Sequence, residues 1–284
     1  MSFCDFQYSE NETTINLVKR FIDENPMVNL ITCCGDIADE GYLEKTHRYI
    51  FDKKLFSNKT LAFGCGDHEY WGSSVSPIKM LQHPYTYNKL FNNPKNGCEG
   101  YLNSSYYFKY NKVLFVFLNC GDSNVSVSNF MFTKQAIWLD NVLSNEKDYE
   151  FIIILMHKSL YGDVKQDSAI KKIAPVFIKV FDQYKVDLVI SGHDHEYSRT
   201  KPLKNNKANN HGTIYLDLGS SGDKRRNTGD SIICSSLYDK YIDIKENNYS
   251  LGLIGTIENN VLSLEVRNQH YDIVDQVKIN LKNR

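Results

Sequence analysis

The stretch Ile190-Ser-Gly-His-Asp-His-Glu-Tyr-Ser-Arg199 decides the fold of this chain. The apolar run before it, residues 186–190, is short, rich in β-branched side chains and closed by Gly192, which is typical of a buried strand. His193 and His195 follow with one residue between them, so both imidazoles face the same side. Open α/β sheets bind ligands at this end of their strands. A lone His-x-His pair is weak evidence for a metal site, so the prediction depends on donors at other strand ends.

Length and composition exclude several classes of protein. The 284 residues can bury a large core, and a net charge of −1 gives no cationic field for nucleic acid or an anionic membrane. No apolar run approaches the roughly 20 residues of a membrane span. The amino terminus lacks a signal-peptide pattern, although a mature chain without its leader has the same appearance. The seven cysteines are an odd number and lie mostly in apolar runs, which predicts free thiols in a reducing, cytoplasmic compartment; they include Cys33, Cys34, Cys65 and Cys120.

Strand and helix patterns alternate along the first two thirds of the chain, and strands dominate the last third. Buried strands are predicted at 28–34, 61–65, 151–156, 186–190 and 213–218, and amphipathic helices at 11–25, 42–56, 132–143 and 169–184. Antiparallel pairs are predicted for 105–110 with 113–120 and for 249–257 with 261–267, followed by a strand at 273–281. The aromatic stretch 70–104 has no clear period and is interpreted as an excursion over the strand ends. Two sheets packed face to face with helices outside satisfy this pattern, and we expect a single domain over residues 1–284.

Candidate metal ligands follow five apolar runs, namely the short lead at residues 1–4 and the predicted strands at 28–34, 61–65, 151–156 and 186–190. The candidates are Asp5, Asp36, Asp67, His157, and the pair His193 and His195. Carboxylates and imidazoles together suit divalent Mn, Fe or Zn, and the set lacks the thiolates of a structural zinc site. One carboxylate can bridge two ions about 3.5–4 Å apart, which generates a bound hydroxide and holds a phosphoryl group. Asp36 is the candidate for that bridge, because Gly35 before it allows a tight turn.

Five stretches of the chain match the motifs of one known family. They are Gly35-Asp-Ile-Ala-Asp39, Gly66-Asp-His-Glu69, Gln135-Ala-Ile-Trp-Leu139, Leu155-Met-His157 and Gly192-His-Asp-His-Glu-Tyr-Ser-Arg199. In these motifs the chain resembles the calcineurin-like metallophosphoesterases, and within them the purple-acid-phosphatase-like branch. The resemblance extends from Asp5 to about Gly222. It implies an α/β fold, a four-layer αββα sandwich of two mixed sheets, with a dinuclear metal centre at the strand ends.

The resemblance also implies a role for each candidate residue. The first metal would be held by Asp5, Asp36 and His195, and the second by Asp36, Asp67, His157 and His193. The cofactor would be two divalent or mixed-valence ions of Mn, Fe or Zn. His68 would be the histidine that contacts the phosphoryl oxygen and helps the leaving group depart.

The chain departs from the family pattern at several positions. The usual Asn of the Gly-Asn-His-Glu motif is Asp67, which adds a negative charge that strengthens metal binding and repels an anionic substrate. The tyrosine of the purple enzymes falls at Asp39, so we expect no tyrosinate chromophore. The common Asp-x-His opening is Asp5-Phe-Gln7, in which Gln7 offers either a carbonyl ligand or a hydrogen bond. The further substrate-contacting histidines of plant purple phosphatases are absent from residues 158–171.

Other residues have ordinary interpretations beside the functional ones. The segment Lys224-Arg-Arg226 is interpreted as a solvated loop rather than a phosphate contact, and Asp39 as a solvated carboxylate at a helix start. We expect Tyr197 and Arg199 to brace their loop. Packing is the expected role of Tyr70 and Trp71, and no partner pattern surrounds four histidines, His47, His83, His211 and His270.

Together these features predict a dinuclear metal-dependent phosphoesterase that acts on a small phosphate ester, with no nucleic-acid or membrane partner. A metal-bridging hydroxide would be the nucleophile, with Asp36 bridging the ions and His68 assisting the leaving group. Monoester and diester hydrolysis both fit. The alternatives are a nucleotide-type diphosphatase or phosphodiesterase, and a non-catalytic metallophosphoesterase-like binding module.

Overall fold

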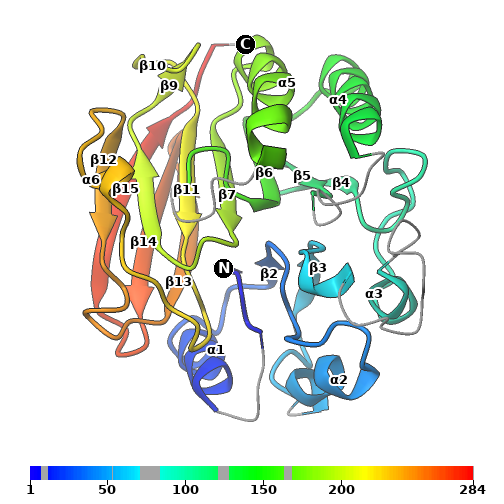
Figure 1. Ribbon diagram of the computed structural model, residues 1–284, viewed down its shortest axis with the longest axis vertical. Coiled ribbons are helices and arrows are strands. Elements are labelled where there is room, and N and C mark those ends of the chain that lie inside the picture. Colours follow the sequence, from blue (N-terminus) through cyan, green and yellow to red (C-terminus); the bar gives the residue numbers. More distant parts are fainter. Residues whose placement is uncertain (8–11, 53, 71–83, 121–127, 163–167, 284) are drawn as a thin grey trace.

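The computed structural model describes residues 1–7, 12–52, 54–70, 84–120, 128–162 and 168–283, and its strands form two large sheets (Figure 1). The six-stranded sheet has the order β15-β14-β13-β1-β2-β3. Its strands are β1 (Ser2–Phe3), β2 (Leu30–Cys33), β3 (Thr60–Phe63), β13 (Leu251–Glu258), β14 (Val261–Asn268) and β15 (Ile273–Asn280). The strands β1, β2 and β3 run parallel, whereas β1 pairs antiparallel with β13, so the sheet is mixed.

The seven-stranded sheet has the order β12-β8-β11-β7-β6-β5-β4. Its strands are β4 (Tyr106–Tyr110), β5 (Val113–Leu118), β6 (Phe151–Lys158), β7 (Leu188–Gly192), β8 (Tyr197–Thr200), β11 (Ile214–Leu218) and β12 (Tyr238–Ile242). Parallel pairing joins β5, β6, β7 and β11, and the outer strands are antiparallel. A short pair, β9 (Leu203–Lys204) and β10 (Lys207–Ala208), stands apart.

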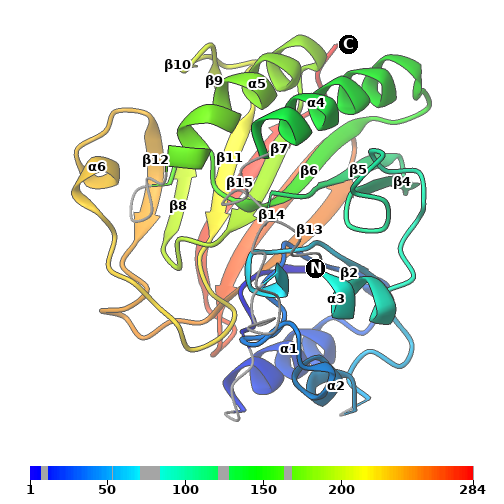
Figure 2. The same cartoon turned by 45° about the vertical axis from the view of Figure 1, so that its right-hand side comes forward.

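Helices cover the outer face of each sheet. They are α1 (Thr13–Glu24), α2 (Glu44–Asp52), α3 (Tyr85–Leu90), α4 (Ser128–Asn145), α5 (Ser168–Tyr184) and α6 (Asp230–Ile233), with a short 3₁₀ turn, η1 (His68–Tyr70). In Figure 2, α4 and α5 lie on one side of the sheets, and α1 and α2 lie on the opposite side.

The alternation of side chains along β6 builds two cores at once. Ile153 and Leu155 pack between the two sheets, while Ile152 and Ile154 pack against α4 and α5. The outer face of β1, β2 and β3 packs in the same way against α1, α2 and α3. Four layers result, which confirms the αββα sandwich of two mixed sheets.

Both predicted hairpins form. Asn111 and Lys112 connect β4 to β5 with φ angles of 47° and 64°, and Asn259 and Asn260 connect β13 to β14 with 50° and 65°. Two successive positive φ angles are characteristic of type I′ turns, and asparagine tolerates them better than most residues.

Several segments differ from the sequence interpretation, and the sequence predicts no element where β9, β10, α6 and β12 form. Residues 197–200 form β8 rather than a loop, and residues 85–90 form α3 within the stretch that has no clear period. The sequence of β8 is short and polar, so it does not predict a strand. The strand is buried because it lies between β11 and β12. Trp71 and His83 lie outside the described residues. Among the helices that the structure describes, none has both the length and the apolar character that a bilayer crossing requires.

A buried ion pair connects the two sheets at their outer strands. Arg199 on β8 donates from Nε to Asp275 Oδ2 on β15 at 2.7 Å, and the Tyr197 hydroxyl donates to the same oxygen at 2.7 Å. Arg199 also donates from Nη1 to Asp239 at 2.6 Å, but the Asp239 side chain is 51% exposed and that of Asp275 only 8%. Tyr197 and Arg199 therefore brace a strand and its contact with the second sheet.

We expect Asp275→Ala to lower the free energy of unfolding by about 3 kcal/mol, because it leaves a buried guanidinium partly uncompensated. The matched control, Asp239→Ala, should cost less than about 1 kcal/mol, because solvent screens that pair. Burial alone would raise the pKa of Asp275, but the hydrogen bonds from Arg199 and Tyr197 lower it. The difference between wild type and Asp275→Ala should therefore be present above about pH 4 and shrink as the pH falls further. Urea denaturation at several pH values measures it, and equal costs for the two variants would contradict the assignment.

Candidate metal centre

The carboxyl ends of five strands bring the six predicted ligands to one edge of the sandwich. Asp5, Asp36 and Asp67 follow the parallel strands β1, β2 and β3 of the first sheet. His157 is the penultimate residue of β6, and His193 directly follows β7, both in the second sheet. Residues that are far apart in the sequence therefore meet where the two sheets face each other.

Asp67, His157 and His193 form the first group of potential ligands, whose donor atoms all lie within 4.8 Å of one another. Asp67 Oδ1 lies 2.9 Å from both His157 Nε2 and His193 Nδ1, and the two nitrogens are 3.3 Å apart. Ligand atoms bound at about 2.0–2.2 Å to one Zn ion stand about 3–3.5 Å from one another. The spacing of this group thus suits one metal ion with little rearrangement.

Asp5, Asp36 and His157 form a second group within the same 4.8 Å limit. His157 Nε2 lies 3.2 Å from Asp36 Oδ2 and belongs to both groups. Asp5 Oδ1 is buried without a hydrogen-bond partner among the described residues, as expected of an atom placed to bind a cation. His195 stands beside this group, with its Nε2 3.7 Å from Asp5 Oδ1. The predicted division of the ligands between two metals remains a prediction.

The backbone at four of these ligands adopts the left-handed conformation. The φ angles are 47° at Asp5, 52° at Asp36, 71° at His193 and 56° at His195. Such angles are uncommon for residues with a Cβ and cost about 1–3 kcal/mol each, so they persist only where the surroundings impose them. Their clustering at one edge indicates that the fold aims these side chains for a purpose other than stability.

Glycines provide the space that two of the carboxylates occupy. A Cβ atom at Gly66 would lie 2.1 Å from Asp36 Oδ1, and one at Gly192 would lie 2.0 Å from Asp5 Oδ2. Any side chain at either position would displace the neighbouring carboxylate. The glycines of the two motifs are therefore as necessary to the site as the ligands.

Glu69 is the residue whose role the sequence analysis missed. Its carboxylate accepts hydrogen bonds of 2.7–3.4 Å from the backbone N–H groups of Asp36, Ile37, Ala38 and Gly66. It thereby holds the loop after β2 against the loop after β3. The only signal was its place at the end of the Gly-Asp-His-Glu motif, which does not distinguish a ligand from a support.

The electrostatics of the site favour a bound cation. Burial raises the pKa of Asp5 to about 7, and the nearby Asp36 carboxylate adds to the effect. Burial opposes the charged form of His157, but Asp36 and Asp67 outweigh it and raise the pKa of His157 well above its usual range. Burial also acts against ionised Asp67, yet hydrogen bonds with His157 and His193 hold the pKa of Asp67 well below the usual range. A metal would replace these protons as the counter-charge, so its affinity should rise with pH.

His68 faces the ligands from η1. Its Nδ1 contacts the backbone carbonyl of Asp39 at 2.7 Å, and its Nε2 lies 3.8 Å from Asp36 Oδ2. Because a carbonyl only accepts, Nδ1 carries a proton and Nε2 is directed toward the site. Gln7 donates from Nε2 to Asp36 Oδ2 at 2.9 Å, so the hydrogen-bonding alternative for Gln7 is present, and its ligand role stays open.

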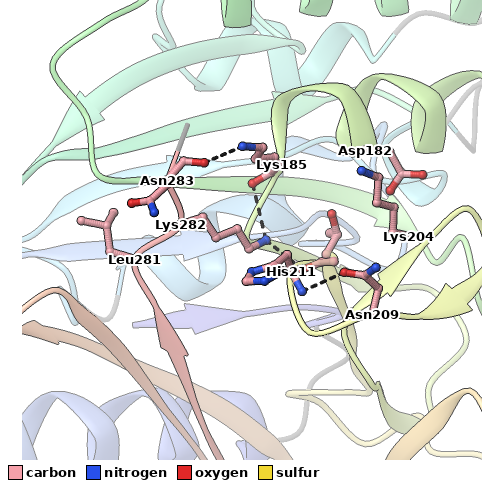
Figure 3. A pocket seen from close by; sticks show the side chains of 10 residues that line it. Asp182, Lys185, Lys204, Asn209, His211, Leu281, Lys282 and Asn283 are labelled. Atoms are coloured by element: carbon pink, nitrogen blue, oxygen red, sulfur yellow. Dashed lines mark hydrogen bonds between the residues drawn. The ribbon is translucent and has the colours of Figure 1, made fainter.

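A cavity of about 460 Å³ lies elsewhere (Figure 3). The residues that line it include Lys185, which precedes β7, His211, which precedes β11, and Lys282, which follows β15. It is therefore at the amino ends of these strands, about 16 Å along five-residue strands from the metal ligands. The Lys282 ammonium donates to the carbonyls of residues 186 and 212 at 2.7 and 2.8 Å, which fixes the segment after β15 against the residues that precede β7 and β11. This cationic group has a structural role.

Glu69→Gln should destabilise the two loops that carry the site. The side-chain NH₂ of Gln is a donor, so it cannot accept the hydrogen bonds that the backbone N–H groups donate to the Glu69 carboxylate. The expected loss is about 3 kcal/mol in the free energy of unfolding of the metal-free protein. Urea denaturation measures the change. Glu40→Gln is the control, since Glu40 is exposed and its backbone carbonyl, which the substitution retains, accepts the hydrogen bonds from Leu43 and Thr46. A loss confined to metal affinity, with stability unchanged, would instead make Glu69 a ligand.

The chain is similar in sequence to known proteins over part of its length. An uncharacterized protein of Mycobacterium tuberculosis, Rv2577, is 31% identical over 85 residues, which cover 28% of this chain and 16% of that protein. Purple acid phosphatase 21 of Arabidopsis thaliana is 28% identical over 81 residues, which cover 28% and 18%. The matched part thus spans less than a fifth of the length of these relatives.

Two solved structures have the same fold. Purple acid phosphatase PPD1 from yellow lupin (Lupinus luteus) seeds superposes with a TM-score of 0.77 at 17% identity, over 98% of this chain and 53% of that one. GAP50, described as the anchor in the inner membrane complex of Plasmodium, gives a TM-score of 0.68 at 15% identity, over 100% and 88%. At these identities the likeness establishes the architecture alone.

The family model of the calcineurin-like phosphoesterases matches residues 4–197, a range that begins before Asp5 and ends after His195. It therefore includes all six residues that meet at the strand ends. The chain belongs to the calcineurin-like phosphoesterase family.

Proposed function

We propose that the protein is a dinuclear metal-dependent hydrolase of small phosphate esters. The observation that carries this proposal is the pair of buried ligand groups that share His157 and contain three carboxylates and two imidazoles. The donor types suit Mn, Fe or Zn, and the unpartnered Asp5 oxygen and the ligand spacing fit such ions. Membership of the phosphoesterase family supports the same reaction class.

Two ions bound by these groups would supply Lewis-acid activation of an attacking water and neutralise the charge on the phosphoryl oxygens. The chain supplies the geometry that this chemistry needs. Asp36 belongs to the second group and lies 3.2 Å from the shared His157, and it is fixed by a hydrogen bond from the His68 backbone to Oδ1 at 2.9 Å and one from Gln7 to Oδ2. A fixed carboxylate requires no reorganisation during the reaction, which is how preorganised sites lower barriers.

His68 is proposed to hold the proton that the leaving oxygen receives. The Asp39 carbonyl occupies Nδ1, so a second proton on the ring can reside only on Nε2, the nitrogen that faces the ligands. General-acid transfer of this kind contributes about 10²–10⁴-fold to rates in other enzymes. Substrates with basic leaving groups depend on it most.

Elemental analysis of the purified, metal-equilibrated protein should find close to two ions per chain, since two ligand groups are present. Asp36→Ala should retain fewer ions and lose at least about 10³-fold in phosphatase activity, because it removes a ligand of the second group and the proposed bridge between the ions. Asp230→Ala, an exposed substitution at α6, is the control and should match wild type in both measurements. A folded wild-type chain that takes up no metal and hydrolyses neither a chromogenic monoester nor a diester would instead support the non-catalytic binding module.

His68→Ala should slow the hydrolysis of phenyl phosphate about 10²-fold or more, and that of 4-nitrophenyl phosphate clearly less. Nitrophenolate leaves without full protonation, whereas phenolate needs the proton that the imidazole delivers. The ratio of the two kcat values, with metal content verified in each variant, measures the effect. Equal losses for both substrates would assign His68 to binding and exclude it as the acid.

A further inference from the structure

The loop after β11 is fixed at the edge of the metal centre by contacts at both of its sides. Ser221 N donates to the Cys4 carbonyl at 3.0 Å, beside the predicted ligand Asp5. Arg226 N donates to the His195 carbonyl at 2.7 Å, and the Lys224 carbonyl contacts His195 Nδ1 at 2.8 Å. The backbone of this loop therefore orients His195 and has little freedom of its own.

The Lys224 side chain connects this loop to the loop after β2 of the other sheet. Its ammonium forms an ion pair with Asp39 Oδ1, 185 residues away in the sequence, on the loop after β2. The same Asp39 oxygen lies 3.4 Å from His68 Nδ1. Lys224 and His68 thus contact one carboxylate oxygen from two sides, which places the ammonium beside the proposed leaving-group histidine.

The two members of this ion pair remain accessible to a ligand. Their side chains are 46% exposed for Lys224 and 35% exposed for Asp39, whereas the predicted metal ligands are buried. The neighbouring Arg225 is held instead by the Tyr249 carbonyl, Asn248 and Ser250, at 2.6–2.8 Å. An exposed ammonium on a flexible four-carbon stem can exchange one anionic partner for another, unlike a clamped guanidinium.

We propose that Lys224 is a substrate-binding residue. Its ammonium dissociates from Asp39 and contacts a phosphoryl oxygen, which favours dianionic phosphate monoesters over monoanionic diesters. This inference rests on the proposed phosphoesterase function. Asp39 acts as the resting partner that keeps the ammonium in place beside His68. A second negative charge on the phosphate gains more from a nearby cation than a single charge does, which is the origin of the preference.

Two substitutions distinguish substrate binding from a structural brace, because only in the first case do they affect phosphate binding differently. Lys224→Met removes the cation and should weaken orthophosphate binding about tenfold. Asp39→Asn releases the ammonium from its resting partner and keeps the backbone carbonyl that orients His68, so phosphate binding should be unchanged or tighter. If the pair only braced the two loops, both variants would weaken binding alike.

The experiment measures orthophosphate affinity by calorimetry and KM and kcat for 4-nitrophenyl phosphate and bis(4-nitrophenyl) phosphate, all with metal-loaded protein above pH 7. Lys224→Met should raise KM for the monoester about tenfold and for the diester no more than about threefold, with kcat for the diester near wild type. Lys224→Arg should restore most of the monoester preference. Lys245→Met, which removes an exposed lysine from the turn before β13, is the control for net charge and should have no effect.

The inference is overturned if Lys224→Met stays within twofold of wild type for orthophosphate and the monoester, or if Asp39→Asn weakens both as much as Lys224→Met does. These outcomes are separate from a failure of the proposed function, in which metal-loaded wild type hydrolyses neither ester. In that event orthophosphate binding by wild type and Lys224→Met still decides whether Lys224 binds phosphate.

Discussion

The whole site depends on turning the backbone sharply at the ends of parallel strands so that short carboxylates and imidazoles point at one another. Four of the six predicted ligands achieve this with positive φ angles. The strain is offset by contacts of residues that are not themselves ligands: Glu69 accepts four backbone N–H groups, among them that of Asp36, and glycines leave room for the carboxylates of Asp5 and Asp36. A preorganised metal site is in this sense a property of the loops, and the two-sheet sandwich is the frame that keeps those loops opposed.

The added negative charges near the candidate metal centre each have a partner close by. The chain has Asp67 and Asp39 where the resembled family has an uncharged asparagine and a tyrosine. Asp67 lies between His157 and His193, and Asp39 pairs with Lys224, so each added carboxylate has cationic or hydrogen-bonding partners of its own. The additional negative charge is therefore compensated locally, which limits the repulsion of an anionic substrate that Asp67 alone would cause.

Sequence patterns predicted the strands from β2 to β7, β11 and β13 to β15, and the ligands at the ends of four of them, because burial and turn chemistry are local properties. The run 151–156 and the asparagine turns are examples, since each specifies its conformation without knowledge of the rest of the chain. The features that the sequence could not predict depend on contacts between residues that are far apart along the chain. The strand β8 is polar and became visible only between its two neighbours, and Glu69 looked like a fourth motif residue until its backbone partners were known. Lys224 resembled a solvated loop residue because Asp39, its partner, lies 185 positions away.

The pairing of β1 with β13 has a consequence for the order in which the molecule can form. Ser2 is matched with Leu253, so the strand that delivers the first carboxylate is flanked on one side by a strand that is made about 250 residues later. A ribosome releases the amino-terminal segment long before that neighbour exists, and contacts of such wide sequence separation form late and slowly. The nascent chain must therefore carry an unpaired β1 edge until β13 has been made. The sheet that positions Asp5 becomes complete only when the β13–β14 hairpin pairs with β1, although that hairpin lies outside the range that identifies the family.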